Sequence, residues 1–407
     1  MTTMTTQSAP PVWRFARRVE GAGDGVGAIL ALADPGDAIA LSGGFPAPET
    51  FPTEVLGDLL GQAVGRGAPV ALQYTATEGL LALRATLRRW IRWGQGVEPP
   101  EDGLIVTSGG VEALSLLARC LVDPGDRVLV ESPTYLGAID VFSGMEGRVE
   151  AVPTDGEGVD PDALDAALAT RPTPKLLYVI PDFQNPTGRW WSTERRRAVV
   201  SVCRHRGVPV AEDVAYRELA FDPEDRPSLW SLGPDVVVQV GTFSKIFFPG
   251  VRLGWAAGDP ALVAAMTVAK QGSDQCAGGL GQWLAERYLA GGHLEAGLRA
   301  ARSLYAERAS ALGSALARHL PQGCTWTRPE GGFFAWVSAP AGVDTAALVP
   351  EAHRQGVAYV PGVPFFPGRN ETRHLRLSYS RATAEQIDEG VRRLGRVLAQ
   401  ATEEVQR

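Results

Sequence analysis

Between about residues 104 and 258, six short apolar runs alternate with stretches of helical pattern. The runs are continuously apolar, as expected of strands in a sheet that helices cover on both faces. This alternation predicts an α/β architecture with a mostly parallel sheet. Such sheets bind ligands at the carboxyl ends of their strands, so the residues that follow the runs are the first candidates for a site. The predicted strands are 104–107, 127–131, 175–180, 208–212, 236–240 and 253–257.

The periodicity changes after about residue 290, which indicates a second, smaller domain. Apolar residues from Leu294 to Leu316 recur at helical spacing and predict one long amphipathic helix. An extended segment near 375–379 and a closing helix over about 383–401 complete an α+β pattern. The predicted organisation is a disordered N-terminus (1–12), a segment that packs with the small domain (13–55), a large α/β domain (56–290) and a small C-terminal α+β domain (291–407).

Composition narrows the class of protein. A net charge of −7 without a Lys/Arg-rich block argues against nucleic-acid binding. The four cysteines are scattered without a CxxC pair, which suits free thiols in a reducing cytoplasm. The five histidines show no metal-ligand spacing, so no metal site is expected. The sequence shows neither a secretory signal nor a run of membrane-spanning length, so a cytoplasmic protein is expected.

Lys245 is the single most informative residue. It ends the segment Gly241-Thr-Phe-Ser-Lys245, directly after the apolar run 236–240. Desolvation at the end of a buried strand favours the neutral amine, which is the form that Schiff-base chemistry with an aldehyde cofactor requires. Taken alone, a lysine is most often a solvated surface charge, so its significance depends on the other residues that follow strands.

Three further features follow predicted strands. The turn Thr107-Ser-Gly-Gly110 precedes a helix whose free N–H groups can hold a phosphate, although any glycine-rich turn has this form. Asn185-Pro-Thr-Gly188 reads alone as a proline-containing turn, and Asp213, with Tyr216 three residues on, reads alone as a helix cap. Together with Lys245 they match the needs of pyridoxal phosphate (PLP): an amine for the imine, an acid for the ring nitrogen and donors to the ring oxygen.

With these motifs the chain resembles the class I aminotransferases of the fold-type I PLP superfamily, over about residues 14–400. The resemblance is closest to the α-aminoadipate/kynurenine aminotransferase-like branch. It implies a large domain with a mostly parallel mixed sheet sandwiched by helices, and a smaller α+β domain. The segments that carry it are Leu41-Ser-Gly-Gly-Phe-Pro-Ala-Pro-Glu-Thr-Phe-Pro52, Gln73-Tyr-Thr-Ala-Thr-Glu-Gly79, Pro181-Asp-Phe-Gln-Asn-Pro-Thr-Gly188 and Gly241-Thr-Phe-Ser-Lys-Ile-Phe-Phe-Pro-Gly-Val-Arg-Leu-Gly254.

The resemblance implies roles for the residues around the cofactor ring. Lys245 forms the imine with the cofactor and moves the proton at the substrate Cα. Asp213 pairs with the pyridine nitrogen, and Asn185 and Tyr216 hydrogen-bond the ring hydroxyl. Tyr135 stacks on the ring face. The implied catalytic set is therefore Lys245, Asp213 and Tyr216.

The resemblance also implies which residues hold the substrate carboxylate and the cofactor phosphate. Arg376 clamps the substrate α-carboxylate by a bidentate pair. Gly43, Gly44 and Asn185 belong to the substrate-binding set. Tyr74 reaches the phosphate bound by the partner subunit, which implies a homodimer with shared active sites. Phosphate contacts are implied for Ser108, Gly109, Gly110, Val111, Thr242, Ser244 and Arg252.

The chain departs from the family pattern at two places. The family often has a side-chain donor and a glutamine where this chain has Gly110 and Val111, so backbone N–H groups are expected to hold the phosphate. Relatives in this branch place an arginine in the N-terminal helix, whereas the stretch 23–33 has none and the nearest arginines, Arg17 and Arg18, lie upstream in an open register. Aminoadipate specificity is therefore not simply carried over, and Asp24 or Asp274 would favour a cationic side chain.

The predicted activity is ping-pong transamination between an L-amino acid and a 2-oxo acid. The aromatic, proline-rich stretch 360–368 predicts an apolar wall of the pocket, but the donor, the acceptor and the kind of metabolism stay open. Another PLP reaction on the same scaffold (β- or γ-elimination, cyclisation or oxidation) is the alternative, because such enzymes keep the same cofactor residues. A ligand-sensing regulator would carry an N-terminal DNA-binding domain, and an inactive homologue would be expected to lose Lys245 or Asp213.

Overall fold

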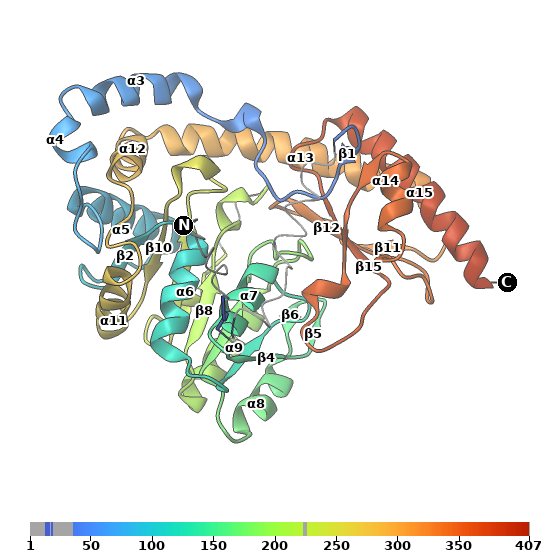
Figure 1. Cartoon of the computed structure of the whole chain (residues 1–407), viewed down its shortest axis with the longest axis horizontal. Helices are drawn as coiled ribbons and strands as arrows, with labels where there is room; N and C mark the ends of the chain where they lie inside the picture. The colour runs from blue at the N-terminus through green and yellow to red at the C-terminus, as the bar shows by residue number, and fades with distance from the viewer. Residues whose placement is uncertain (1–12, 17, 19–35, 223–225, 407) are drawn as a thin grey trace, which may run out of the picture.

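The computed structural model describes residues 13–16, 18, 36–222 and 226–406. The disorder expected over 1–12 and the stretch 23–33 lie outside the described residues. Figure 1 shows a larger α/β unit and a smaller unit, with the long helix α13 (His293–His319) running across the top of the view between them. This helix is the one that the spacing of apolar residues after 290 predicts.

The larger unit is built on a seven-stranded sheet with the order β2-β10-β9-β8-β7-β3-β4. Only β10 runs antiparallel to its neighbours among the strands described, so the mostly parallel sheet is confirmed. The edge strand β4 is absent from the sequence prediction because its residues are polar or partly exposed. The strands are β2 (Leu104–Thr107), β3 (Arg127–Val130), β4 (Arg148–Ala151), β7 (Leu176–Val179), β8 (Val210–Asp213), β9 (Val237–Thr242) and β10 (Gly254–Ala257).

Both faces of this sheet are covered by helices. Tyr178 packs into one apolar cluster with α6, α7 and α11, while its neighbours Leu177 and Val179 pack into another with α8, α9 and α10. This arrangement explains why apolar residues follow one another in the runs instead of alternating with polar ones, because each side chain faces one helical layer or the other. The covering helices are α6 (Gly110–Leu121), α7 (Leu136–Gly144), α8 (Pro161–Ala169), α9 (Thr193–Arg206), α10 (Leu229–Leu232) and α11 (Pro260–Gln271).

Side-chain caps fix where several of these helices begin. Asp160 accepts hydrogen bonds from the N–H groups of Asp162 and Ala163 at the start of α8, and Ser192 accepts from Arg195 at the start of α9. Each such cap contributes about 1 kcal/mol to helix stability. The remaining elements of this unit are α3 (Thr53–Val64), α4 (Ala68–Ala71), α5 (Leu81–Gln95), α12 (Gly279–Ala290), β5 (Thr154–Asp155), β6 (Gly158–Val159), η1 (Pro48–Thr50), η2 (Arg217–Leu219) and η3 (Pro249–Val251).

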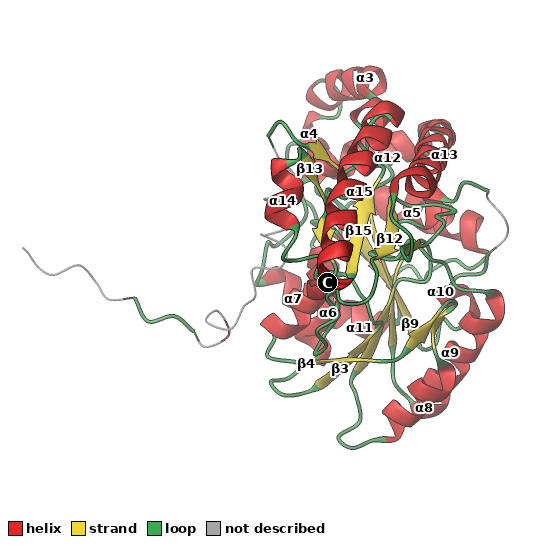
Figure 2. Ribbon diagram, turned by 90° about the vertical axis from the view of Figure 1, so that its right-hand side faces the viewer, coloured by secondary structure: helices red, strands yellow, loops and turns green. Residues whose placement is uncertain are grey.

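The smaller unit contains a four-stranded antiparallel sheet with the order β11-β12-β15-β14. Figure 2 shows β12 and β15 above the larger sheet, with α13 and α15 beside them. The N-terminal segment joins this unit, because β1 pairs in parallel with β13. Its elements are β1 (Ile39–Ala40), β11 (Thr325–Trp326), β12 (Phe334–Ser338), α14 (Val349–Arg354), β13 (Val357–Ala358), β14 (Val360–Pro361), η4 (Val363–Phe365), β15 (His374–Ser378) and α15 (Ala384–Gln406).

A buried ion pair anchors the loop between β7 and α9, which carries Asn185. Arg196 is fully buried, donates to Asp182 at 2.7 Å and also donates to the carbonyl oxygens of Pro181 and Trp191. Burial alone would raise the pKa of Asp182, but the charges of Arg196 and Arg217 lower it from 3.8 to about 2. The pair therefore contributes stability above about pH 4, and this contribution is lost as the pH falls towards 2.

We expect Arg196→Met to lower the free energy of unfolding by about 3 kcal/mol, because it removes a partner from a buried carboxylate. The matched control is Arg204→Met on the same helix. Arg204 pairs with Asp235 at the surface, so its loss is expected to cost less than about 1 kcal/mol. Urea unfolding of both variants measures the difference, and equal losses would contradict the structural role given to Arg196.

Candidate active site

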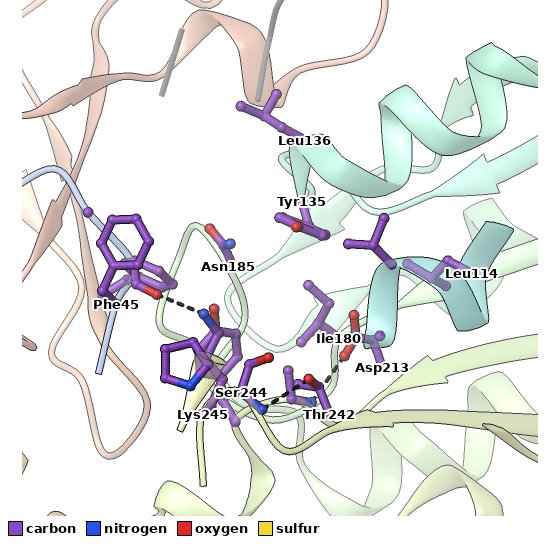
Figure 3. Close-up of a pocket in the computed structure, with 18 of the residues that line it drawn as sticks. Phe45, Leu114, Tyr135, Leu136, Ile180, Asn185, Asp213, Thr242, Ser244 and Lys245 are labelled. Atoms are coloured by element: carbon purple, nitrogen blue, oxygen red, sulfur yellow. Dashed lines mark hydrogen bonds between the residues drawn. The ribbon is translucent and has the colours of Figure 1, made fainter. Parts of the chain in front are cut away.

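A cavity of about 470 Å³ lies at the carboxyl ends of the central strands, where the two units meet. Figure 3 shows Lys245, Ser244 and Thr242 on one side of it, with Asp213, Tyr135 and Asn185 around the same space. The structure thus brings together side chains that lie far apart in the sequence. The site residues predicted from the sequence that line the cavity are Gly43, Gly44, Gly110, Val111, Tyr135, Asn185, Asp213, Tyr216, Thr242, Ser244, Lys245, Arg252 and Arg376.

Lys245 lies in the loop that follows β9, and its neighbours Phe243 and Phe247 are buried anchors for that loop. Its Nζ donates a hydrogen bond to the carbonyl oxygen of Gly44 at 2.8 Å. Burial lowers the pKa of Lys245 from 10.5 to about 8, and the positive charge of Arg376 adds to the effect while Asp213 opposes it. With this pKa roughly a tenth of the amine is uncharged at pH 7, and the uncharged form is the one that a nucleophile or base requires.

Asp213 is the last residue of β8 and is buried. Its Oδ2 accepts a hydrogen bond from the Tyr178 hydroxyl at 2.8 Å, and its Oδ1 accepts one from the Ala215 N–H at 3.0 Å. Burial raises the pKa of Asp213 to about 6, against the effect of these donors and of the Lys245 charge. The carboxyl group is thus mostly an anion at neutral pH, able to pair with a cationic ring nitrogen.

Tyr178 is a functional neighbour that the sequence analysis missed. From the sequence, Tyr178 is simply one of the residues in the apolar run of a buried strand. A signal was available, because a buried tyrosine hydroxyl usually finds a hydrogen-bond partner, and the neighbouring strand ends in an aspartate. The hydrogen bond from Tyr178, on the neighbouring strand β7, fixes the orientation of the Asp213 carboxylate.

Arg376 on β15 is buried and makes no ion pair with any acid in the described part of the chain. Its Nη1 donates to Asn185 Oδ1 at 2.8 Å and its Nη2 to the carbonyl oxygen of Ser42 at 2.7 Å. Among the described residues its Nε has no hydrogen-bond partner. The guanidinium lies over the rings of Phe334 and Phe365, at 4.3 and 5.2 Å from their centroids. A buried cation without a counter-ion, at the wall of a cavity, is suited to bind an anion.

Two tyrosines border the same space. Burial raises the pKa of Tyr135 to about 12 and moves that of Tyr216 well above its usual value, so both hydroxyls remain protonated donors at neutral pH. Tyr216 makes edge contacts with the rings of Phe333 and Phe334. The phenol is therefore held firmly from the side of the small unit.

The opposite end of the cavity forms an anion cradle. Gly110 begins α6, so free N–H groups of a 12-residue helix face this end. Arg252 donates through Nη1 to Ser244 Oγ and through Nη2 to the carbonyl oxygen of Ser108, both at 3.4 Å. Gly109 has φ +116°, and a Cβ there would lie 2.8 Å from Arg252 Nη2. A guanidinium, hydroxyl groups and a helix N-terminus form a donor set that fits a phosphate.

Three predicted residues do not line this cavity. The Ser108 hydroxyl donates to Asp274 at 2.6 Å, Gly109 lies against the Arg252 guanidinium, and Tyr74 is 82% exposed. Asp274 is also bound by the buried Lys270 at 2.7 Å. Asp274 is therefore occupied and does not line the cavity, so this geometry does not support it as the partner of a cationic substrate.

Several apolar residues of the lining were not singled out from the sequence. Phe365 belongs to the stretch 360–368, for which the sequence predicted an apolar wall, and Phe334 belongs to β12 of the small unit. Their roles depend on how the two units meet, which no local pattern reveals. The other apolar residues of the lining are Phe45, Leu114, Leu136, Ile180, Ala215 and Pro249.

The described residues contain no group of three or more histidine, cysteine, aspartate or glutamate side chains that could hold a metal ion. All four cysteines are free thiols. No helix in the described part of the chain is both long enough and apolar enough to cross a membrane.

Comparisons with known proteins place the whole chain beside one family of enzymes. The family model for class I and II aminotransferases matches residues 67–394. The chain is 40% identical over 374 residues to the 2-aminoadipate transaminase of Thermus thermophilus, covering 91% of this chain and 92% of that protein. It is 36% identical over 375 residues to aromatic-amino-acid aminotransferase 1 of Thermococcus litoralis, covering 91% and 90%. The crystal structure of Pyrococcus horikoshii kynurenine aminotransferase with PMP matches with a TM-score of 0.91 at 36% identity, covering 95% of this chain and 97% of that one.

The low pKa of Lys245 can be measured directly, because the chain contains only three lysines, Lys175, Lys245 and Lys270. We expect labelling of ligand-free protein by an amine-specific reagent to reach half of its maximal rate at Lys245 near pH 8. Peptide mass spectrometry distinguishes the three sites. The exposed Lys175 is the internal reference, and the buried, ion-paired Lys270 should stay unlabelled. A midpoint at Lys245 near the ordinary value of 10.5 would contradict the electrostatic argument.

Proposed function

Because the chain belongs to the class I and II aminotransferases, we propose that the cavity described above is its active site and that its residues have the following roles. The protein is an enzyme that moves an amino group between an amino acid and a 2-oxo acid, with pyridoxal phosphate as cofactor. The single observation that carries the proposal is the meeting, in one cavity, of a lysine with lowered pKa, a buried aspartate and a buried arginine without a counter-ion.

The cavity has groups for each part of the cofactor. The cradle formed by Gly110, Thr242, Ser244 and Arg252 would hold the phosphate, with the helix N-terminus supplying N–H donors. Asp213 would face the ring nitrogen, while Asn185 and Tyr216 would donate to the ring oxygen and Tyr135 would lie on the ring face. Ser108 and Gly109 shape the cradle from behind. All of these assignments use groups that line or support the cavity.

Bound pyridoxal phosphate supplies an aldehyde that takes up the amino group and a ring that accepts electrons from the substrate. Asp213, held by Tyr178 as an anion, stabilises a proton on the ring nitrogen. The Lys245 amine, once free, takes and returns a proton at the substrate Cα. Its lowered pKa suits this work, because an amine that is half neutral near pH 8 can both accept and give up a proton.

Arg376 is proposed to bind the α-carboxylate of the amino acid. Its guanidinium is fixed by Asn185, Ser42 and the two phenylalanine rings, so a carboxylate that binds it is also fixed in direction. A fixed carboxylate and a fixed amino group leave one orientation for the Cα–H bond. Orientation of this kind favours removal of the Cα proton over loss of the carboxylate.

The reaction is tested by a half-reaction. Enzyme carrying pyridoxal phosphate is mixed with single amino acids and no acceptor, and the cofactor absorbance and product masses are followed. We expect stoichiometric formation of a 2-oxo acid and pyridoxamine phosphate, and borohydride treatment before the reaction should attach the cofactor to the Lys245 peptide. Repeated turnover to ammonia, or to a cyclised or oxidised product, would establish the alternative chemistry instead.

The matched variant for this experiment is Arg376→Lys, which keeps the charge but loses the planar fork. The second-order rate constant of the half-reaction should fall roughly 10- to 100-fold, the worth of one hydrogen bond to a charged group. Cofactor attachment to Lys245 should persist. An unchanged rate constant would show that Arg376 does not bind the α-carboxylate.

We also propose that the enzyme is a homodimer, located in the cytoplasm as the free thiols suggest. Tyr74 is exposed and outside the cavity, as expected of a residue that acts in the partner subunit. Leu72 and Leu81, close to Tyr74 in the sequence, are also exposed apolar side chains, and Val111 is exposed at the lining of the cavity itself. An apolar surface of this kind commonly marks a protein interface, and here a second copy would complete the site.

Light scattering should therefore give twice the 43.3 kDa of one chain. Tyr74→Phe should preserve the dimer and weaken the affinity for pyridoxal phosphate by roughly tenfold, because it removes one hydrogen bond to a charged group. Leu72→Glu should weaken the dimer. A monomer with full cofactor affinity would contradict both the assembly and the role of Tyr74.

A further inference from the structure

The charged residues of the cavity are few and each has a task in the proposed function. Among the described residues, the charged side chains that line it are Asp213, Lys245, Arg252 and Arg376. The first two serve the reacting centre, Arg252 serves the phosphate and Arg376 serves the α-carboxylate. No lining charge within the described part of the chain remains for the side chain of the substrate.

The remaining wall near Arg376 is apolar. Phe365 lies 5.2 Å from the guanidinium carbon and also packs in an apolar cluster with Leu136, Trp336 and Val360. Phe45, next to Gly44, faces the space near Lys245 from the N-terminal segment, and Leu136 lies on another side of it (Figure 3). An amino acid whose carboxylate meets Arg376 would therefore place its side chain among Phe45, Leu136 and Phe365.

The described residue that was a candidate partner for a cationic side chain is already occupied. Asp274 is held by Lys270 and Ser108 and does not line the cavity. A carboxylate placed against the apolar wall would lose its hydration without gaining a partner.

We propose that the preferred amino donors carry an uncharged, apolar or aromatic side chain, seated against Phe45, Leu136 and Phe365. This inference rests on the proposed function of the cavity and names its substrate class. The curated relatives differ on this point, since one is named for aromatic amino acids and another for 2-aminoadipate. The preference proposed for this chain therefore follows from its own residues.

The test compares four amino acids in the single-turnover half-reaction. Norleucine, 2-aminoadipate and lysine share a six-carbon chain and end in a methyl, a carboxylate and an aminomethyl group, and phenylalanine adds an aromatic ring. We expect the second-order rate constants for norleucine and phenylalanine to exceed those for 2-aminoadipate and lysine by roughly 100-fold, as the desolvation of an unpaired charge implies. Calorimetry with the unreactive pair hexanoate and adipate should show the same preference in binding.

A matched pair of variants tests the location of the side chain. Phe45 is only partly buried, so substitutions there should fold, which thermal unfolding verifies. Phe45→Arg should raise the ratio of the 2-aminoadipate to the norleucine rate constant at least about tenfold, because it supplies a counter-ion. Phe45→Leu should leave that ratio low. An unchanged ratio in Phe45→Arg would overturn the placement.

The outcomes distinguish a wrong substrate class from a wrong assignment of the active site. If 2-aminoadipate or lysine reacts as fast as norleucine in the unaltered enzyme, the substrate class is wrong while transamination stands. If none of the four amino acids reacts although borohydride attaches the cofactor to Lys245, the proposed roles in transamination are wrong. The proposed substrate class is then wrong as well.

Discussion

The site depends on one buried cation, the guanidinium of Arg376. It comes from the small unit, it is bound by Asn185 from the large unit, and it is bound by the carbonyl oxygen of Ser42 from the N-terminal segment. A buried charge is tolerated only where its hydrogen bonds are made, so these three segments have to meet in one arrangement. The arrangement also positions Gly44, whose carbonyl oxygen accepts the hydrogen bond of Lys245. A Cβ at Gly44 would lie 2.7 Å from the Phe334 ring, so the close approach of these segments requires glycine there.

The electrostatics of the cavity follow from the same burial. Desolvation lowers the pKa of Lys245 to about 8 and raises that of Asp213 to about 6, so both pKa values lie close to neutral pH. The charge of Arg376 lowers the pKa of Lys245 further. A carboxylate bound at Arg376 would offset that charge and raise the pKa of the lysine, so substrate binding would strengthen Lys245 as a base when it is needed.

The strand-end residues were predictable because their positions follow from local patterns. Asp213 ends β8, and Lys245 and Asn185 lie in the loops that follow β9 and β7, so parallel strands present all three at one edge of the sheet. Tyr178 and Phe334 were not predictable in the same way. Tyr178 lies within a strand, and its role depends on which strand lies next to it. Phe334 depends on the packing of the small unit against the large one. The edge strand β4 was missed because its residues, exposed or half-buried, form no apolar run.

The anion cradle is held rigidly through its backbone. The turn that contains Gly110 and Val111 lacks the polar side chains that the family resemblance leads one to expect, so its N–H groups have to be held in place by other means. Glu112 accepts the Ser108 N–H and Asp274 accepts the Ser108 hydroxyl, and the fully buried Lys270 joins both carboxylates. From the other side Gly254 packs so closely that a Cβ there would lie 2.6 Å from the carbonyl carbon of Gly109. The turn is thus fixed from both sides, and its N–H groups are preorganised for an anion at little further entropic cost.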